Sequence, residues 1–93
     1  FNSEEALRMG LVNSVIENEQ LDSYIHKMTD NIVNNAPLTI RSIKSAVNEG
    51  IKDPEERDIV KVNKMVQECF ESKDYVEGRR AFMEKRPPKF QGN

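Results

Sequence analysis

The chain has 93 residues, of which 37% are hydrophobic and 32% are charged. This is the length of one small domain, and so lean a hydrophobic content leaves little material for a core. Its 14 basic and 16 acidic residues give a net charge of −2, which argues against nucleic-acid binding, since such domains are usually strongly basic. No apolar run approaches the about 18 residues of a membrane span. The single cysteine, Cys69, excludes an internal disulfide and suits a reducing compartment.

The first residues predict a short helix followed by an extended piece. The chain opens on Phe1 instead of methionine, so we expect it to be a piece of a longer protein, and FNSEEALR does not resemble a secretory signal. Ser3 is the predicted N-cap of a helix over residues 3–9, and Gly10 is the predicted left-handed residue after it. In residues 11–16, Leu11, Val15 and Ile16 are apolar and β-prone, which predicts a short strand or an extended linker.

Two amphipathic helices are predicted next. Residues 19–35 carry apolar side chains at spacings of three and four: Leu21, Tyr24, Ile25, Met28 and Ile32. Pro37 fits the first turn of a helix over residues 37–50. The apolar residues of that helix fall on one stripe: Ile40, Ile43, Val47 and Ile51.

The last two predicted helices have wide apolar faces. Asp53, Pro54 and Glu56 predict the start of a helix over residues 54–71, and the start signal at Asp74 predicts a helix over residues 75–85. Their apolar residues are Ile59, Val62, Met65, Val66, Cys69 and Phe70 on the first, and Tyr75, Val76, Ala81, Phe82 and Met83 on the second. The second is apolar on two edges, which is typical of a helix held between neighbours. Pro87 and Pro88 then impose an extended tail with Phe90 as an anchor. The predicted fold is all-α, with about five helices.

Residues that carry chemistry are few. One cysteine and one histidine cannot make a zinc site, so no metal ligand is predicted. Cys69 is interpreted as a core thiol and His26 as a solvated or interface side chain. The paired acids Glu4-Glu5 and Glu55-Glu56 stand in first helical turns, where they stabilise the helix. No catalytic residue is therefore predicted.

One basic cluster allows two interpretations. It consists of Arg79, Arg80, Lys85, Arg86 and Lys89. The first interpretation is a solvated face near a helix C-terminus, where cations are favoured. The second is a contact to a phosphate-bearing ligand, with Lys85 as a point charge.

Three segments carry a family resemblance: SEEALRMGLVNSVI, APLTIRSIKSAVNEG and EGRRAFMEKRPPKFQG. In this order and at these distances they resemble the C-terminal part of the crotonase family, the enoyl-CoA hydratase/isomerase superfamily. The first matches the family's A-x-x-x-G-L-V segment and the last its E-G-x-x-A-F-x-E-K-R-x-P-x-F-x-G ending. The resemblance implies a helical C-terminal domain of the crotonase fold, whose N-terminal spiral of ββα units is absent from this sequence.

The resemblance also implies an organisation and a partner. Residues 1–16 would leave the missing spiral core, residues 17–86 would form the helical oligomerisation domain, and residues 87–93 would form the extended C-terminal tail. Family members build trimers, often paired into hexamers. We therefore expect self-association or an unusually apolar surface, with Val66 and Phe82 as buried contacts.

The function implied is part of an enzyme. The chain would be the C-terminal, oligomerising and CoA-site-completing part of an enoyl-CoA hydratase-like lyase, which hydrates 2-enoyl-CoA thioesters in fatty acid metabolism. The acyl-CoA is the substrate, no resident cofactor is implied, and the catalytic groups belong to the spiral, so the chain alone is expected to be inactive. In some members the lysine of the closing E-K-R motif, here Lys85, helps to bind the CoA nucleotide of a neighbouring subunit. An aromatic residue that lies near the adenine in those members would align with Val66, which is not aromatic.

Alternatives remain open at this stage. Within the family they are a Δ3,Δ2-enoyl-CoA isomerase or another acyl-CoA enzyme. From a different class comes a free-standing helical interaction module with no catalytic parent. No nucleic-acid or membrane partner is expected, and the implied location is the cytoplasm of a bacterium or the mitochondrial matrix of a eukaryote.

Overall fold

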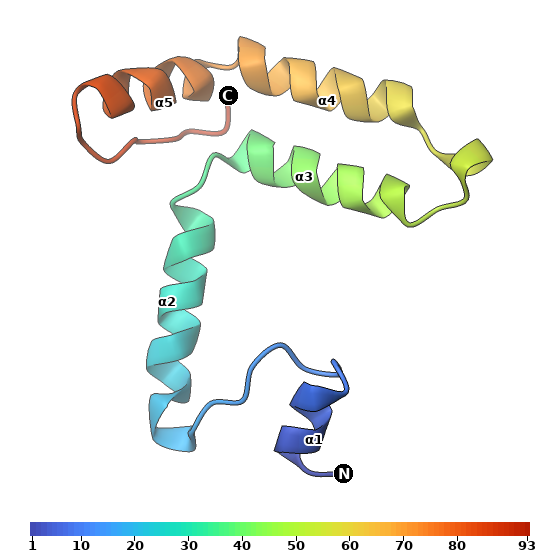
Figure 1. The fold of residues 1–93 in the computed structure, drawn as a ribbon. Helices are drawn as coiled ribbons and strands as arrows, with labels where there is room; N and C mark the ends of the chain where they lie inside the picture. The colour runs from blue at the N-terminus through green and yellow to red at the C-terminus, as the bar shows by residue number, and fades with distance from the viewer. The chain divides into compact units, whose positions relative to one another are not determined.

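The computed structural model describes residues 1–93 and contains helices but no strand. The five α-helices of Figure 1 are α1 (Ser3–Arg8), α2 (Leu21–Val33), α3 (Pro37–Gly50), α4 (Ile59–Glu71) and α5 (Lys73–Met83). The all-α prediction is therefore confirmed. The strand allowed for residues 11–16 does not form. The chain divides into two compact units, Phe1–Asn31 and Ile32–Asn93.

The first unit begins with a helix that is capped at both ends. The N-cap of α1 is Asn2 instead of the predicted Ser3: Asn2 Oδ1 accepts from the Glu5 amide (2.8 Å), and Glu5 Oε2 accepts from the Asn2 amide (2.9 Å). These reciprocal bonds satisfy two otherwise unpaired N–H groups, which a cap at Ser3 would not do. Gly10 has φ +75° and ends the helix, as predicted.

The rest of the first unit carries few buried side chains. A 3₁₀ turn over Asn18–Gln20 precedes α2, so this helix starts at Leu21, two residues later than predicted. Tyr24 Oη lies 3.0 Å from Ser14 Oγ and ties α2 to the segment before it. Ala6 is the one buried hydrophobic residue of this unit. The apolar face of α2 is accordingly left exposed.

In the second unit, α3 and α4 lie side by side (Figure 1). Helix α3 begins at Pro37 and ends at Gly50, as predicted. Its buried positions, however, are Ser42 and Glu49, each 5% exposed. The predicted stripe is exposed by 37% to 81% along its members: Ile40, Ile43, Val47 and Ile51. Small and polar side chains thus occupy the buried face of α3, and the apolar stripe lies outside it.

The predicted start of the fourth helix was also wrong. Pro54–Glu56 forms only a 3₁₀ turn, and the Asp53 side chain caps nothing. Helix α4 starts at Ile59, with Asp58 as its N-cap: Asp58 Oδ1 accepts from the Lys61 amide at 2.9 Å. The residues after Asp53 therefore form a turn, but this turn does not continue into α4.

Bonds from the end of α3 explain this shift. The Glu49 carboxylate accepts from the Asp58 amide (2.8 Å) and from Lys52 Nζ (2.9 Å). Arg57 donates to the carbonyls of Gly50 (3.1 Å) and Lys52 (3.0 Å), which lie at and just after the end of α3. These contacts satisfy terminal carbonyls and hold the connection extended at Arg57. Position 58 is the first from which α4 can start.

A single residue, Ser72, separates α4 from α5. Its Oγ donates to the Cys69 carbonyl (2.7 Å) and accepts from the Tyr75 amide (3.0 Å), so it serves the end of one helix and the start of the next. Helix α5 therefore starts at Lys73 and not at Tyr75 as predicted. The Asp74 carboxylate, predicted as part of the start signal, is engaged elsewhere.

Candidate functional site

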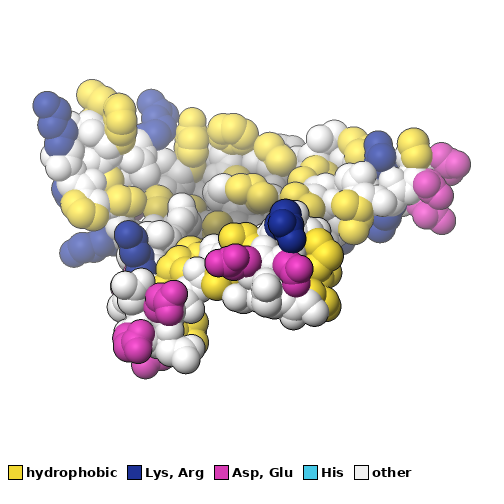
Figure 2. Space-filling view, turned by 60° about the horizontal axis from the view of Figure 1, so that its bottom comes forward, with side chains coloured by type: hydrophobic (Ala, Val, Ile, Leu, Met, Phe, Trp, Pro, Cys, Tyr) yellow, Lys and Arg dark blue, Asp and Glu magenta, His cyan; other side chains and the backbone are white.

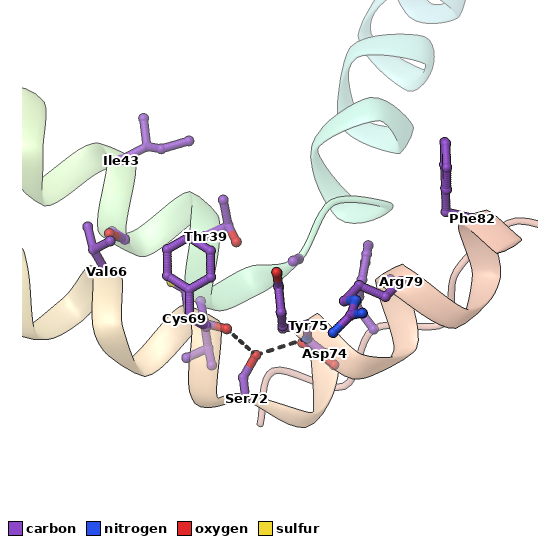
Figure 3. A pocket seen from close by; sticks show the side chains of 15 residues that line it. Thr39, Ile43, Val66, Cys69, Ser72, Asp74, Tyr75, Arg79 and Phe82 are labelled. Atoms are coloured by element: carbon purple, nitrogen blue, oxygen red, sulfur yellow. Dashed lines mark hydrogen bonds between the residues drawn. The ribbon is translucent and has the colours of Figure 1, made fainter.

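An apolar groove of about 570 Å³ lies in the second unit, among α3, α4, α5 and the C-terminal tail (Figure 3). Hydrophobic side chains make up most of its wall: Leu38, Ile43, Val66, Phe70, Tyr75, Phe82 and Phe90. The rings of Phe70 and Tyr75 meet edge to face with centroids 5.2 Å apart, and the Arg79 guanidinium lies 5.9 Å from the Tyr75 centroid. The groove is thus an aromatic surface with one cation at its edge.

Much of this wall is open in the single chain. Val66 and Phe82, predicted as buried contacts, are 41% and 82% exposed. Figure 3 shows Phe82 directed away from the body of α5. Across the whole chain only Ala6 and Ala81 are fully buried hydrophobic residues, and Figure 2 shows hydrophobic side chains scattered over the exposed face. A partner is required if Val66 and Phe82 are to be buried.

The single cysteine and the single histidine belong to different units. Cys69 is half-buried in the groove wall. His26 belongs to the first unit, is exposed, and its Nδ1 lies 2.7 Å from the carbonyl oxygen of Asp22 on its own helix. His26 is thus exposed in the single chain, which suits both a solvated and an interface side chain. No group of three or more metal-ligating side chains occurs in the chain.

The tail returns along α5 and is held there by Asp74 (Figure 1). The carboxylate of Asp74 is 2% exposed and accepts from the amides of Gln91 and Gly92, each at 2.7 Å. Its own amide donates to the carbonyl of Asn93 (3.0 Å). Phe90 lies so close to Gly78 that a Cβ built there would be 3.4 Å from the ring. Residues 87–93 form no helix or strand, and Phe90 is half-buried.

A second carboxylate, one helical turn further along α5, holds the start of the tail. The Glu77 carboxylate accepts hydrogen bonds from both terminal nitrogens of Arg86, at 2.7 and 3.0 Å, and from the Lys89 amide at 2.9 Å. The Arg86 guanidinium, followed by the Lys89 amide, lowers the pKa of the Glu77 carboxyl to about 2. The same pairing raises the pKa of Arg86. Glu77 is therefore a charged anchor at any pH near neutrality.

The interpretation of residues 74–77 as a helix start does not predict these bonds. They join residues 9 to 18 positions apart, and they form only because the tail reverses direction after α5. The signal that points to them is the pair of acids on one face of a helix, followed by Arg86 and two prolines that force an extended return.

Lys85 makes this reversal in a left-handed conformation. Helix α5 ends at Met83, two residues before the predicted end, and Lys85 has φ +53°, the one positive φ of a non-glycine residue in the chain. The Lys85 amide donates to the Phe82 carbonyl (3.2 Å) and the Arg86 amide to the Ala81 carbonyl (3.1 Å). These two bonds define the turn that usually places glycine at this position. A lysine here carries backbone strain.

The structure divides the predicted basic cluster. Arg86 is paired with Glu77 and Glu84, and Arg79 lies over the Tyr75 ring. The exposed ammonium of Lys85 takes part in no hydrogen bond or ion pair. The ammonium of Lys85 is therefore free to bind a phosphate-bearing ligand, whereas the guanidinium of Arg86 is already paired.

The well-ordered acids have structural tasks. Glu5 caps α1, Glu49 joins α3 to the start of α4, and Asp58 caps α4. The hydrogen bonds from Asp58 and Lys52 hold the pKa of Glu49 below its usual range. By contrast, Glu55 and Glu56, predicted to cap, lie in the 3₁₀ turn that starts no helix. None of the helices is long and apolar enough to span a membrane.

Comparison with known proteins agrees over the whole chain. The sequence model described as enoyl-CoA hydratase/isomerase matches residues 1–93. The chain is 36% identical over 90 residues to a crotonyl-CoA hydratase of Syntrophomonas wolfei, with 97% of this chain and 35% of that protein covered. It is 34% identical over 86 residues to a short-chain-enoyl-CoA hydratase of Clostridium acetobutylicum, with 92% and 33% covered.

A solved structure agrees with these sequence relatives. The crystal structure of an enoyl-CoA hydratase from Bacillus anthracis superimposes with a TM-score of 0.77 at 30% identity, over 98% of this chain and 35% of that one. The chain spans about a third of the length of the relatives it matches. The resemblance carried by the three sequence segments is confirmed, and the chain belongs to the enoyl-CoA hydratase/isomerase family.

Proposed function

We propose that this chain is the C-terminal helical part of an enoyl-CoA hydratase-like enzyme that adds water to 2-enoyl-CoA thioesters in fatty acid metabolism. The observation that carries the proposal is the match of nearly the whole chain to two relatives, one named a short-chain-enoyl-CoA hydratase and the other a crotonyl-CoA hydratase. The acyl-CoA is the substrate, and the chain itself holds no catalytic residue. In support, Glu5, Glu49, Asp58 and Asp74 cap helices or bind backbone amides.

The test is turnover of a short 2-enoyl-CoA by the full-length protein, followed by loss of the ultraviolet absorbance of the conjugated thioester. We expect hydration by the full-length protein and none by the 93-residue chain. Turnover by the 93-residue chain above a buffer control would contradict the proposal. A 3-enoyl-CoA substrate tests the isomerase alternative, which predicts appearance of that absorbance.

We also propose that the second unit takes part in self-association, as a trimer or hexamer of the full-length protein. The proposal is supported by the open apolar wall around Val66 and Phe82 and by the exposed stripe of α3. A monomeric full-length protein at high concentration in sedimentation would contradict it. The division into an exit segment (1–16), a helical oligomerisation domain (17–86) and a tail (87–93) belongs to the same proposal, as does a cytoplasmic location, supported by bacterial relatives.

Finally, we propose that Lys85 binds the CoA nucleotide bound to a neighbouring subunit. The exposed ammonium with no protein partner supports this role. Replacing Lys85 by methionine in the full-length protein should raise the KM for acyl-CoA about tenfold, the loss expected for one hydrogen bond to a charged group, with kcat unchanged. Lys89→Met is the matched control, since the part of Lys89 bound by Glu77 is the backbone amide. A free-standing interaction module would not bind or turn over acyl-CoA.

A further inference from the structure

The left-handed turn at Lys85 requires support from outside itself. A residue with a Cβ is disfavoured at φ +53°, and such conformations persist only where the surrounding structure holds them. The two backbone bonds of the turn are available equally to glycine, which would take the position without strain. A lysine in this place indicates that the direction of its side chain matters.

The support comes from the second turn of α5. Glu77 binds Arg86, the residue directly after Lys85, through two parallel N–H···O bonds, and it binds the Lys89 amide three residues further on. A bidentate guanidinium–carboxylate pair fixes orientation as well as distance. Residues 86 and 89 are thereby both attached to one side chain of α5. The strained residue is held between this anchor and the helix end.

The second partner of Arg86 does not have this property. Glu84 binds Arg86 only through Nε, is half exposed, and stands one residue before Lys85 in the same turn. A contact within the turn cannot fix the turn relative to the helix. Glu77 and Glu84 thus offer a matched pair: both carry a carboxylate that binds Arg86, and only Glu77 ties it to α5.

We propose that Glu77 is a positioning residue for ligand binding: by holding Arg86 and the Lys89 amide, it keeps Lys85 in the left-handed turn from which its ammonium meets the phosphate groups of the CoA nucleotide. This inference rests on the proposed role of Lys85. Glu77 itself touches no ligand and acts only through Lys85. Its negative charge is paired with the guanidinium of Arg86, so the pair adds no net charge that would repel an anionic nucleotide.

The experiment is a double-mutant cycle on the full-length protein, with the KM for a short 2-enoyl-CoA as the measurement. Glu77→Gln keeps one acceptor and loses the charge and the bidentate pair, and should raise the KM three- to tenfold with kcat unchanged. In the Lys85→Met background the same change should have no further effect, because its only route to the ligand is gone. Glu84→Gln should change the KM less than twofold. Arg86→Lys removes the bidentate geometry more mildly and serves if Glu77→Gln does not fold.

The outcomes separate this inference from the role of Lys85. If Lys85→Met leaves the KM unchanged, the proposed contact of Lys85 is wrong. If Lys85→Met raises the KM but Glu77→Gln has no effect, or the two effects multiply, Lys85 binds the nucleotide without help from Glu77 and the positioning inference is overturned. A purely structural role of Glu77 predicts multiplied effects and a lower kcat.

Discussion

Replacing Lys85 by glycine should stabilise the chain while it removes the proposed ligand contact. A side chain with a Cβ costs about 1–2 kcal/mol in the left-handed region. Glycine recovers this cost but loses about 0.5–1 kcal/mol through the greater freedom of the unfolded chain. The free energy of unfolding should therefore rise by about 0.5–1 kcal/mol.

The chain also offers the reverse substitution, from glycine to a residue with a Cβ. Gly10 occupies the equivalent position after α1, at φ +75°, and a Cβ built there meets nothing within 4 Å. Gly10→Ala should therefore lower the free energy of unfolding by about 0.5–1 kcal/mol through the backbone alone. The two substitutions should act with opposite signs at positions of the same backbone geometry.

Urea unfolding followed by circular dichroism measures both effects. Lys85→Ala is the control for charge, because it removes the ammonium and keeps the Cβ and the strain. We expect Lys85→Ala to remain within about 0.5 kcal/mol of the parent chain. A Lys85→Gly chain no more stable than Lys85→Ala would show that the turn is unstrained, and Glu77 would then not be needed to hold it.

Three further predictions follow from the tail and the groove. Asp74→Asn removes a buried charged acceptor from two amides and should cost about 1–3 kcal/mol in urea unfolding, with detachment of Phe90 visible as faster hydrogen exchange of residues 89–92. Since the folded pKa of Glu77 is about 2, below its usual 4.5, its contribution to stability is present above pH 4.5 and is lost as the pH falls toward 2; Glu77→Gln should make the acid branch of a stability–pH curve shallower, and an unchanged branch would argue against the pairing. Phe82→Ala should alter the stability of the single chain by less than about 0.5 kcal/mol, since the ring is 82% exposed, yet weaken self-association in sedimentation; a loss near 3–5 kcal/mol at low concentration would mean that the ring is buried within one chain.

Helix content and fold class could be predicted from the sequence because local signals determine them. Pro37 and Gly10 mark boundaries that the structure keeps, since each acts through its own backbone. Asp53 failed as a cap because Glu49 in α3 and Arg57 in the connection fix the chain before α4. These bonds join residues seven and nine positions apart, which a four-residue start pattern does not contain.

The buried face of α3 and the binding of the tail could not be predicted for a related reason. Periodicity identifies the apolar stripe of a helix but assumes that the stripe is what becomes buried within the chain. Here Ser42 is buried and Ile43 is exposed. The roles of Asp74 and Glu77 depend on the tail reversing at Lys85, a conformation that the residue type disfavours. In both cases the failure marks a surface or a turn that the functional proposals use.

The one-residue corner at Ser72 limits how the groove can vary. Because its hydroxyl is bonded to the last turn of α4 and to the first turn of α5, an inserted residue would break one of the two caps. There is accordingly no loop between α4 and α5 that can be lengthened to accommodate a bulkier ligand. At this end the groove is altered by exchanging side chains on either side of the corner, such as Cys69 and Tyr75, which both line it. Efforts to redesign what the groove accepts should therefore begin with these two positions and leave the length of the chain between the helices unchanged.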